Sequence, residues 1–326
     1  MVNMVKFLIN RLLLSLLIIW GILTITFLVI HLAPGDPSSI YVKPEIGAKA
    51  VENIRRQMGL DLPLWKQYLS WVSEFIQGNF GISFTHKRPV SHIFAEAIPN
   101  TLQLTAVVFL IQFIVGISLG IIMAVMYKTK VDFILNSLCL FFYSLPGFWL
   151  ALMGILLFSI KLSWLPSSQM ESLQQIDGFW AQIVDRIQHL IMPVAVLAIP
   201  FIAYTARFVR GSLSDVLQQD YIRTVTAYGV NRYKILFKYA LKNALLPLNT
   251  LIGVYLPFLL GGAVITEYIF SWPGLGRITV NAIFAHDYPI ILASGFIAAV
   301  AVIVGNLISD LLYHRIDPRI KIAGHV

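Results

Sequence analysis

The stretch Asp220-Tyr-Ile-Arg-Thr-Val-Thr-Ala-Tyr-Gly229, which continues to Leu245-Leu-Pro247, is a polar segment between two strongly apolar ones. Gly229 is its only break, and its basic residues are Arg223, Arg232, Lys234, Lys238 and Lys242. Because its flanks suit lipid, the segment is expected at a membrane surface, where a helix–Gly–helix element can dock onto a soluble partner.

The composition of the chain predicts one polytopic membrane domain. Its 326 residues are 58% hydrophobic and 12% charged, and the mean hydropathy is +0.78, whereas soluble domains carry about 25% charged residues. The net charge of +8 does not indicate nucleic-acid binding, because no basic tract is interleaved with aromatic residues. Cys139 is the only cysteine, which excludes a disulfide within the chain.

Six uncharged runs predict six membrane-spanning helices and an all-α fold: 12–30, 101–126, 133–160, 190–206, 246–266 and 288–309. All but 190–206 reach the about 20 residues needed to cross about 30 Å of hydrocarbon. That run is expected to depend on Arg207 extending its charged end to the interface. The first run resembles a signal peptide, but it is too long and lacks a cleavage site, so it is interpreted as a retained span.

The basic residues predict the orientation in the membrane. With both termini in the cytoplasm, the inner segments hold 14 of the 24 basic residues and five acids, whereas the outer segments hold 10 basic residues and 11 acids. The positive-inside rule therefore places the termini and the 220–247 stretch in the cytoplasm. The short turn 127–132, with Lys128 and Lys130, is the clearest single indicator.

The chain divides into three predicted parts: residues 1–31 with the first span, an outer helical section at 32–99, and a core at 100–326 with spans two to six. The outer section contains a predicted amphipathic helix whose apolar face comprises Trp65, Tyr68, Val72 and Phe75. This helix either lies on the lipid headgroups through its aromatic residues or forms a ligand-binding surface.

No motif in the sequence indicates catalysis or a metal site. The chain has no phosphate-binding loop, no His-Glu-x-x-His and no Cys/His cluster at metal spacing. Gly116-Ile-Ser-Leu-Gly120 matches a nucleophile elbow, but Ser118 falls in the middle of an apolar helix, so helix packing is favoured. Gly116 with Gly120, and Gly295 with Ala299, suit close helix packing. Four histidines are interpreted as surface residues: His31, His86, His92 and His286.

Charge is missing from the predicted spans, and the ionisable residues Lys161, Glu267 and Asp310 lie at their edges. Proton-driven transporters and ion pumps place such residues inside the membrane. Any uphill transport is therefore expected to draw its energy from outside this chain. Seven neutral polar residues either line a path or satisfy neighbouring helices: Gln103, Gln112, Asn136, Tyr143, Tyr204, Asn249 and Asn306.

The cytoplasmic stretch has two amphipathic halves. The apolar face of the first comprises Leu217, Tyr221, Val225 and Tyr228, and the second carries a basic row at Lys234, Lys238 and Lys242. Gly229 permits a positive φ, which allows the first helix to end and the chain to turn sharply. These patterns support protein docking and contact with anionic lipid equally.

Motifs spread over nearly the whole chain, in a shared order and spacing, support an assignment. They are Tyr221-Ile-Arg-Thr224, Ala227 with Gly229, Tyr239 to Pro247, His31 to Pro37, Gly59 to Tyr68, Gly78 to Gly81, Pro99 to Leu104, Glu267 to Gly276, Asp287 to Pro289 and Asp317 to Ile320. Together they resemble the peptide/nickel-type permease subunits of ATP-binding-cassette importers. The long outer section is similar to that of the first permease subunit of oligopeptide and dipeptide systems.

This resemblance implies a type I importer permease fold in the bacterial inner membrane. It also implies a second homologous permease subunit, two ATPase subunits that hold ATP and Mg²⁺, and an external solute-binding protein. The chain itself is expected to hold no cofactor or metal and to catalyse no reaction. The implied solutes are di- and oligopeptides, with nickel, glutathione or another small solute as alternatives. A secondary transporter or channel would predict charges in the spans.

In that family the loop corresponding to 210–246 forms coupling helices that sit in a cleft of the ATPase. The resemblance assigns this coupling role to Asp220, Tyr221, Arg223, Thr224, Ala227, Gly229, Leu246 and Pro247. Three positions depart from the residues common in the family, which affects the details of the contact: Val225, Tyr228 and Tyr239.

Overall fold

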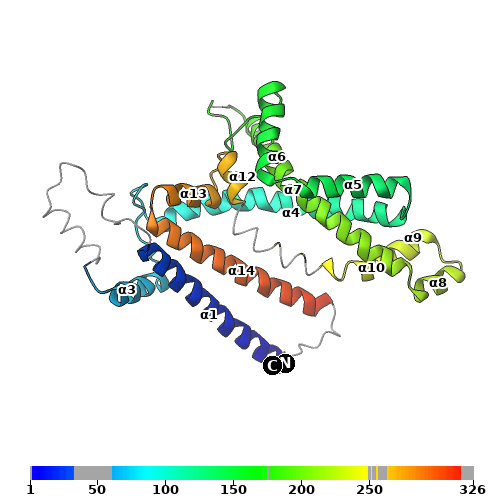
Figure 1. The fold of residues 1–326 in the computed structure, drawn as a ribbon, viewed down its shortest axis with the longest axis horizontal. Coiled ribbons are helices and arrows are strands. Elements are labelled where there is room, and N and C mark those ends of the chain that lie inside the picture. The colour runs from blue at the N-terminus through cyan, green and yellow to red at the C-terminus, as the bar shows by residue number, and fades with distance from the viewer. Residues whose placement is uncertain are drawn as a thin grey trace.

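The computed structural model describes residues 2–32, 61–174, 176–248, 251, 255 and 263–316, and its regular elements there are helical. The α-helices are α1 (Val2–Leu32), α3 (Leu64–Ile76), α4 (Val90–Val125), α5 (Lys130–Ser144), α6 (Gly147–Gly154), α7 (Phe179–Leu217), α8 (Asp220–Ala227), α9 (Arg232–Lys234), α10 (Leu241–Ala244), α12 (Val264–Ile269), α13 (Leu275–Phe284) and α14 (Tyr288–Ile316). Two π-helical segments are η2 (Ile155–Lys161) and η3 (Ile235–Ala240). Figure 1 shows α12 and α13 at one end of α4 and α8 to α10 at the other.

Within the described residues, three helices are long and apolar enough to cross a membrane: α4, α7 and the Tyr288–Ile308 part of α14. The bent pair formed by α5 with α6 and η2 is a fourth candidate. The first predicted run, 12–30, lies in α1, whose described apolar part is Leu13–Leu28. The run 246–266 lies mostly outside the described residues.

Three predicted boundaries differ from the structure. Helix α4 begins at Val90 rather than near residue 100, with Pro99 inside it, because Val90, Ile93 and Ala97 continue a buried stripe outward from the span. The marginal run 190–206 is the middle of the 39-residue helix α7, so it does not depend on Arg207 to reach the interface.

The run 133–160 is not one straight helix, because the chain bends by 96° between α5 and α6. Leu145 is extended at the end of α5, and Pro146 precedes α6. Proline disfavours a helical conformation in the residue before it and supplies no N–H to the preceding turn. The predicted single span is therefore two helical pieces.

The core contact of the membrane part is the crossing of α4 and α7, where two glycines of α4 allow close approach. An ideal Cβ on Gly120 would lie 2.6 Å from Val209 Cβ and 2.7 Å from the carbonyl oxygen of Ala206. A Cβ on Gly116 would lie 2.8 Å from Thr205 Cβ. The predicted packing role of this glycine pair is confirmed.

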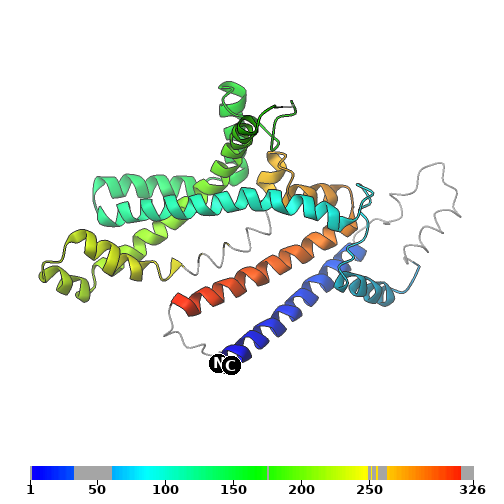
Figure 2. The ribbon, with the colours of Figure 1, turned by 180° about the vertical axis from the view of Figure 1, so that it is seen from behind.

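A second helix pair, α1 with α14, lies beside this core, and both views show the two helices side by side (Figures 1 and 2). Gly295 of α14 faces Thr26 of α1, since a Cβ there would lie 3.7 Å from Thr26 Oγ1, and Ala299 is buried. The small-residue pair on α14 is therefore part of a buried face, as predicted.

Helix α3 packs its aromatic face on α1 and α14. Trp71 and Phe75 stack at 4.5 Å between ring centroids, and Phe75 reaches Phe296 of α14 at 5.6 Å. Tyr68 donates or accepts a 2.7 Å hydrogen bond with Thr24 of α1. Trp65, the fourth residue of the predicted face, lies at the helix start with a side chain that is 60% exposed.

Two buried carboxylates hold together the end of the molecule that contains α12 and α13. Glu267, fully buried, accepts hydrogen bonds from Thr101 Oγ1 of α4 at 2.9 Å and from the amide of Gly276 at 2.7 Å. Asp287, also fully buried, accepts from Ser83 Oγ at 2.6 Å and from the amide of Thr85 at 2.9 Å. These contacts tie the segments around α13 to residues about 170 to 200 positions earlier in the chain.

The pKa of Asp287 reflects opposing causes. Burial raises it, but the hydrogen bonds from Ser83 and from the amides of Thr85 and Phe84 lower it, and the net pKa lies below the ordinary 3.8. A carboxylate with a depressed pKa contributes stability above its unfolded pKa, and this stability is lost as the pH falls through the folded pKa.

We predict that Gly120→Val separates α4 from α7 and lowers the melting temperature of the detergent-purified protein by about 5 °C, since overpacking costs about 1–3 kcal/mol. Gly211→Ala is the matched control, because a Cβ at this helical glycine meets no atom within 4 Å. An unchanged melting temperature for Gly120→Val would contradict the close crossing.

We also predict that Asp287→Asn speeds tryptic cleavage after the exposed Lys87. The amide cannot accept all the hydrogen bonds that hold residues 83–85, and losing hydrogen bonds to a charged group costs about 1.5–3 kcal/mol. Cleavage is followed by mass spectrometry at pH 8, with Asp61→Asn as the exposed control. Equal cleavage rates in the two variants would show that Asp287 does not hold this turn.

Candidate functional site

The predicted coupling element forms a compact helical unit at the end of α7. It comprises α8, α9, η3 and α10, which lie together away from α12 and α13 (Figure 1). The second half contains a π-helical turn, where the sequence periodicity predicted an ordinary helix. Such turns are rare and occur frequently at functional sites.

Helix α8 ends at Gly229 as predicted. Gly229 has φ of 72°, its amide donates to the carbonyl of Thr226 at 2.9 Å, and the amide of Val230 donates to that of Val225 at 3.4 Å. This pair of bonds is a Schellman motif, which a left-handed glycine closes at low cost. The chain can then turn directly into α9.

The inner face of the element is apolar and packs on α7 and α4. Ile222, Ile235 and Ala240 are buried against Leu213 of α7 and Ala124 of α4. Leu217, Tyr221 and Val225 pack against the same cluster, as predicted. Tyr228 does not, because it follows the last residue of α8 and leaves the helical face, so its side chain is 84% exposed.

Tyr221 and Leu246 help to close the unit. The hydroxyl of Tyr221 donates to the carbonyl of Tyr239 at 3.4 Å and accepts from Asn243 Nδ2 at 2.9 Å. Ser212 of α7 donates to the carbonyl of Ala244 at 2.8 Å, two residues before the half-buried Leu246, which precedes the exposed Pro247. The coupling element thus follows α7 directly at its start and is hydrogen-bonded to α7 near its end.

The outer face carries the other predicted coupling residues. Asp220 and Arg223 form a 3.3 Å ion pair in which both side chains are largely exposed, so the pair adds little stability and leaves both groups available. Thr224 and Ala227 are exposed beside them. The basic row Lys234, Lys238 and Lys242 is exposed as well.

Sequence reasoning missed two aromatic residues of this outer face. Tyr233 is 76% exposed and Phe237 is 57% exposed, and both follow Gly229 in the sequence, as the basic row does. The two residues are one helical turn apart, and each immediately precedes a lysine of the basic row. This spacing is the sequence signal that would have indicated them. With Tyr228 they give the surface the aromatic and basic composition common in protein interfaces.

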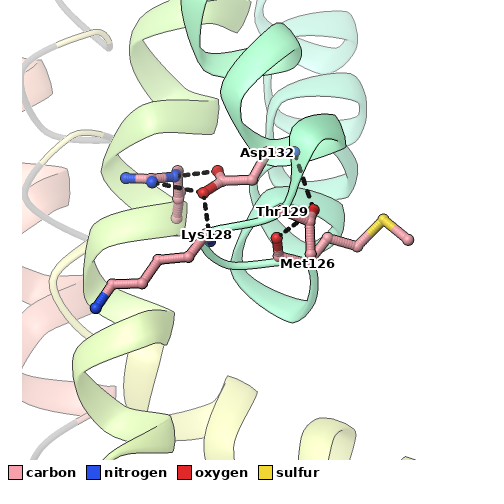
Figure 3. A network of polar contacts seen from close by, with 5 residues as sticks. Met126, Lys128, Thr129 and Asp132 are labelled. Atoms are coloured by element: carbon pink, nitrogen blue, oxygen red, sulfur yellow. Dashed lines mark hydrogen bonds and ion pairs between the residues drawn. The ribbon is translucent and has the colours of Figure 1, made fainter.

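Figure 3 shows how the turn between α4 and α5 is fixed to α7 above this element. Arg210 of α7 donates to Asp132 through Nε at 2.5 Å and Nη2 at 2.8 Å, and Asp132 also accepts from the amide of Lys128 at 2.9 Å. Thr129 caps α5. The guanidinium also lies 5.2 Å from the ring centre of Tyr127. A two-pronged guanidinium–carboxylate contact fixes orientation as well as distance.

The candidate path residues separate into groups. Gln112 is buried at the α4–α7 crossing, while Gln103, Asn136 and Asn306 are half-buried on three different helices. Tyr143 and Tyr204 meet, with 5.9 Å between ring centroids, and Tyr255 joins Tyr204 at 6.4 Å. Tyr255 was not among the residues predicted from the sequence, and Asn249 lies outside the described residues.

Other sequence candidates behave as ordinary structural or surface residues. Ser118 lies inside α4 and donates to the carbonyl of Ile114 at 2.7 Å. His86, His92 and His286 are exposed, as predicted. The side chains of His31 and Asp310 lie outside the described residues.

The end of the molecule that contains α12 and α13 has a polar groove of about 570 Å³ between the 169–173 segment and the 271–277 turn. Arg186 of α7 and Arg277 of α13 both line it. Within the described residues, Arg186 Nε is buried without a hydrogen-bond partner, and Nη2 has only the sulfur of Met170 at 3.4 Å. Glu171 also lines the groove, and Arg277 Nη1 already donates to the carbonyl of Ser271 at 2.6 Å. The groove therefore offers the remaining guanidinium donors beside one carboxylate.

Comparison with known families accounts for nearly the whole chain. Residues 116–322 match the family described as binding-protein-dependent transport system inner membrane component. Residues 4–105 match the N-terminal family of such membrane components.

Two curated relatives show the same relationship over their full length. The oligopeptide transport system permease protein AppB of Bacillus subtilis is 40% identical over 319 residues, which cover 98% of this chain and 100% of AppB. The glutathione transport system permease protein GsiC of Escherichia coli K12 is 36% identical over 318 residues, covering 98% and 99%.

The fold has a relative among solved structures. The inward-facing MetNI methionine ABC transporter has a chain that matches with a TM-score of 0.56 at 16% identity, covering 70% of this chain and 97% of that one. This similarity supports an importer-permease fold. Together with the two family matches, it shows that the chain belongs to the binding-protein-dependent transport system inner membrane components and is a non-catalytic permease subunit of a bacterial ABC importer.

Proposed function

We propose that this permease imports di- or oligopeptides by coupling ATPase movements on its cytoplasmic face to a path through the membrane. The observation that carries the proposal is the coupling element, whose buried face is fixed to α7 while its outer face is exposed. The permease name of AppB supports the peptide class. Glutathione is the second candidate solute, because GsiC is also similar over its whole length.

The proposed architecture has six spans with both termini in the cytoplasm. The four candidate spans in the described residues support it, together with the apolar part of α1 and the uncharged run 246–266. Residues 1–31 would form the first span, 32–99 the outer section, and 100–326 the core. A second homologous permease would complete the path, since one chain supplies only part of its wall.

Two ATPase subunits would bind the cytoplasmic side and hold ATP and Mg²⁺. The proposed contact consists of the predicted coupling residues Asp220, Tyr221, Arg223, Thr224, Ala227, Gly229, Leu246 and Pro247, extended by Tyr228, Tyr233 and Phe237. Charged and aromatic side chains around a glycine turn suit insertion into a protein cleft. Lipid contact by the basic row is the alternative that the sequence left open.

Movement of the coupling element would pass to the membrane through α7. Hydrogen bonds and apolar packing join the two, and the Asp132–Arg210 contact joins α7 to the turn before α5. Closure of the ATPases would shift these parts together as a rigid body. Such a shift is driven only if the ATPases bind the two access states with different affinity.

An external solute-binding protein would deliver the solute from the outer side. The groove with Arg186 and Arg277 lies at that end and offers donors to acidic groups of such a protein. The decisive experiment for the whole proposal is ATP-dependent uptake of radiolabelled tri-alanine by proteoliposomes that contain the complete complex. No uptake of tri-alanine, with uptake of glutathione, would assign the second candidate solute.

We predict that Arg223→Glu and Gly229→Asp each abolish uptake, by reversing an exposed charge and by straining a left-handed turn, while leaving membrane insertion intact. Uptake is compared at matched expression, with Lys66→Glu on the outer helix α3 as the charge-reversal control. Normal uptake in both coupling variants would remove the role assigned to this surface.

We further predict that Asp132→Ala destabilises the protein by about 3 kcal/mol, because Arg210 loses its buried partner. Uptake per ATP hydrolysed should fall as well, since the turn before α5 is no longer held to α7. Melting temperature and the uptake-to-hydrolysis ratio are measured together, with the exposed neighbour Lys130→Ala as control. If the variant is less stable but keeps the wild-type ratio of uptake to hydrolysis, the contact between Asp132 and Arg210 stabilises the fold and does not contribute to coupling.

A further inference from the structure

Three tyrosines from separate parts of the chain meet within the membrane part. Tyr143 lies one residue before the end of α5, Tyr204 lies on α7, and Tyr255 belongs to the uncharged run after the coupling element. Ring centroids lie 5.9 Å apart for the first two and 6.4 Å apart for Tyr204 and Tyr255. Phe201 supports Tyr255 at 5.1 Å. The three rings therefore form one continuous aromatic surface.

The hydroxyl groups of this surface have no partner in the described part of the chain. None of the three forms a hydrogen bond there, although Tyr143 and Tyr204 are 49% and 37% exposed. An unsatisfied polar group in hydrocarbon costs several kcal/mol. Tyr143 and Tyr204 are exposed side by side, so their hydroxyl groups are open to contact with a polar molecule that enters at this place.

The position of the surface along the helices places it between the cytoplasmic edge and the middle of the membrane. At 1.5 Å per residue, Tyr143 lies about 16 Å beyond Asp132 along α5 and Tyr204 lies about 9 Å beyond Arg210 along α7, within a hydrocarbon layer of about 30 Å. The break between α5 and α6 follows immediately at Leu145 and Pro146. Irregular backbone at membrane depth occurs where it is buried in protein or lines a water-filled cavity, and broken helices mark binding sites near the midplane of several transporters.

The chemistry of the surface selects a class of ligand. Phenol hydroxyls donate to carbonyl groups and accept from N–H groups, while the ring faces contact apolar side chains. The three tyrosines carry no charge at neutral pH, and the nearest cation along α7 is the exposed Arg207, one turn towards the cytoplasm. A neutral surface of this kind suits the amide backbone of peptides with varied side chains, whereas a bare metal ion requires carboxylate, imidazole or thiolate ligands.

We propose that Tyr143, Tyr204 and Tyr255 form a solute-contact site in the translocation path, which hydrogen-bonds the amide groups of a passing peptide. This site rests on the proposed function as a peptide importer and specifies where the solute is held. The site binds the polar backbone of the peptide rather than a particular side chain, so it accepts peptides of different sequence.

The first test removes the hydroxyls and keeps the rings. The triple variant Tyr143→Phe, Tyr204→Phe, Tyr255→Phe should lower the rate of tri-alanine uptake in proteoliposomes at least about tenfold, because three hydrogen bonds to the peptide are lost and each contributes about two- to tenfold. ATP hydrolysis stimulated by the binding protein should stay near the wild-type rate. Tyr268→Phe on α12 is the control. Unchanged uptake in the triple variant would overturn the site, and so would loss of the second permease during purification.

The second test measures water access independently of transport. Because Cys139 is the only cysteine, Cys139→Ala gives a background in which Tyr204→Cys can be labelled alone. The charged thiol reagent MTSET should modify this cysteine about tenfold faster than Leu17→Cys, which is exposed on α1, because thiolates form in water and not in lipid. Added tri-alanine should slow the modification in the complete complex.

Different results would contradict the tyrosine site and the proposed function as a peptide importer. Slow modification at position 204, equal to that at position 17, would show that the tyrosines face lipid and would overturn the site. Rapid modification at position 204 supports the site even if wild-type proteoliposomes fail to take up tri-alanine. That failure would contradict the peptide assignment of the proposed function instead.

Discussion

The close crossing of α4 and α7 is the contact on which the other parts depend. Lipid provides no hydrophobic force between helices, so their association rests on packing at short distance, and Gly116 and Gly120 permit that distance. The outer contacts of Thr101 with Glu267 start from α4, while the Arg210 contact and the coupling element start from α7. A displaced crossing would therefore misalign both ends of the molecule.

Features that depend on neighbouring residues could be predicted from the sequence. The apolar runs predicted the helices, the spacing of Gly116 and Gly120 predicted close helix packing without naming the partner helix, and Gly229 predicted the sharp turn after α8. The buried half of the coupling element followed from helical periodicity, apart from Tyr228, which lies just beyond the helix. Local chemistry determines each of these.

Features that depend on residues far apart in the chain could not be predicted from the sequence. The carboxyl group of Asp132 meets Arg210 from α7, and Asp287 meets Ser83 from the opposite half of the chain. A single sequence contains no signal for such pairs, and the same is true of Tyr255 beside Tyr204. The start of α4 and the exposure of Trp65 also depended on which outer segments pack together.

The continuity of α7 has a geometric consequence for transport. The helix runs without interruption from Phe179 to Leu217, which corresponds to about 58 Å at 1.5 Å per residue. If it pivots near one end by about 5°, the other end travels about 5 Å, the pitch of one helical turn. Pro193 and Pro200 lack the N–H groups for two backbone hydrogen bonds of α7. The helix therefore bends most easily in the part that precedes Tyr204 in the sequence. The part of α7 between the coupling element and Tyr204 would thus move as one rigid piece, so a small rotation caused by the ATPase would reach the three tyrosines with little loss.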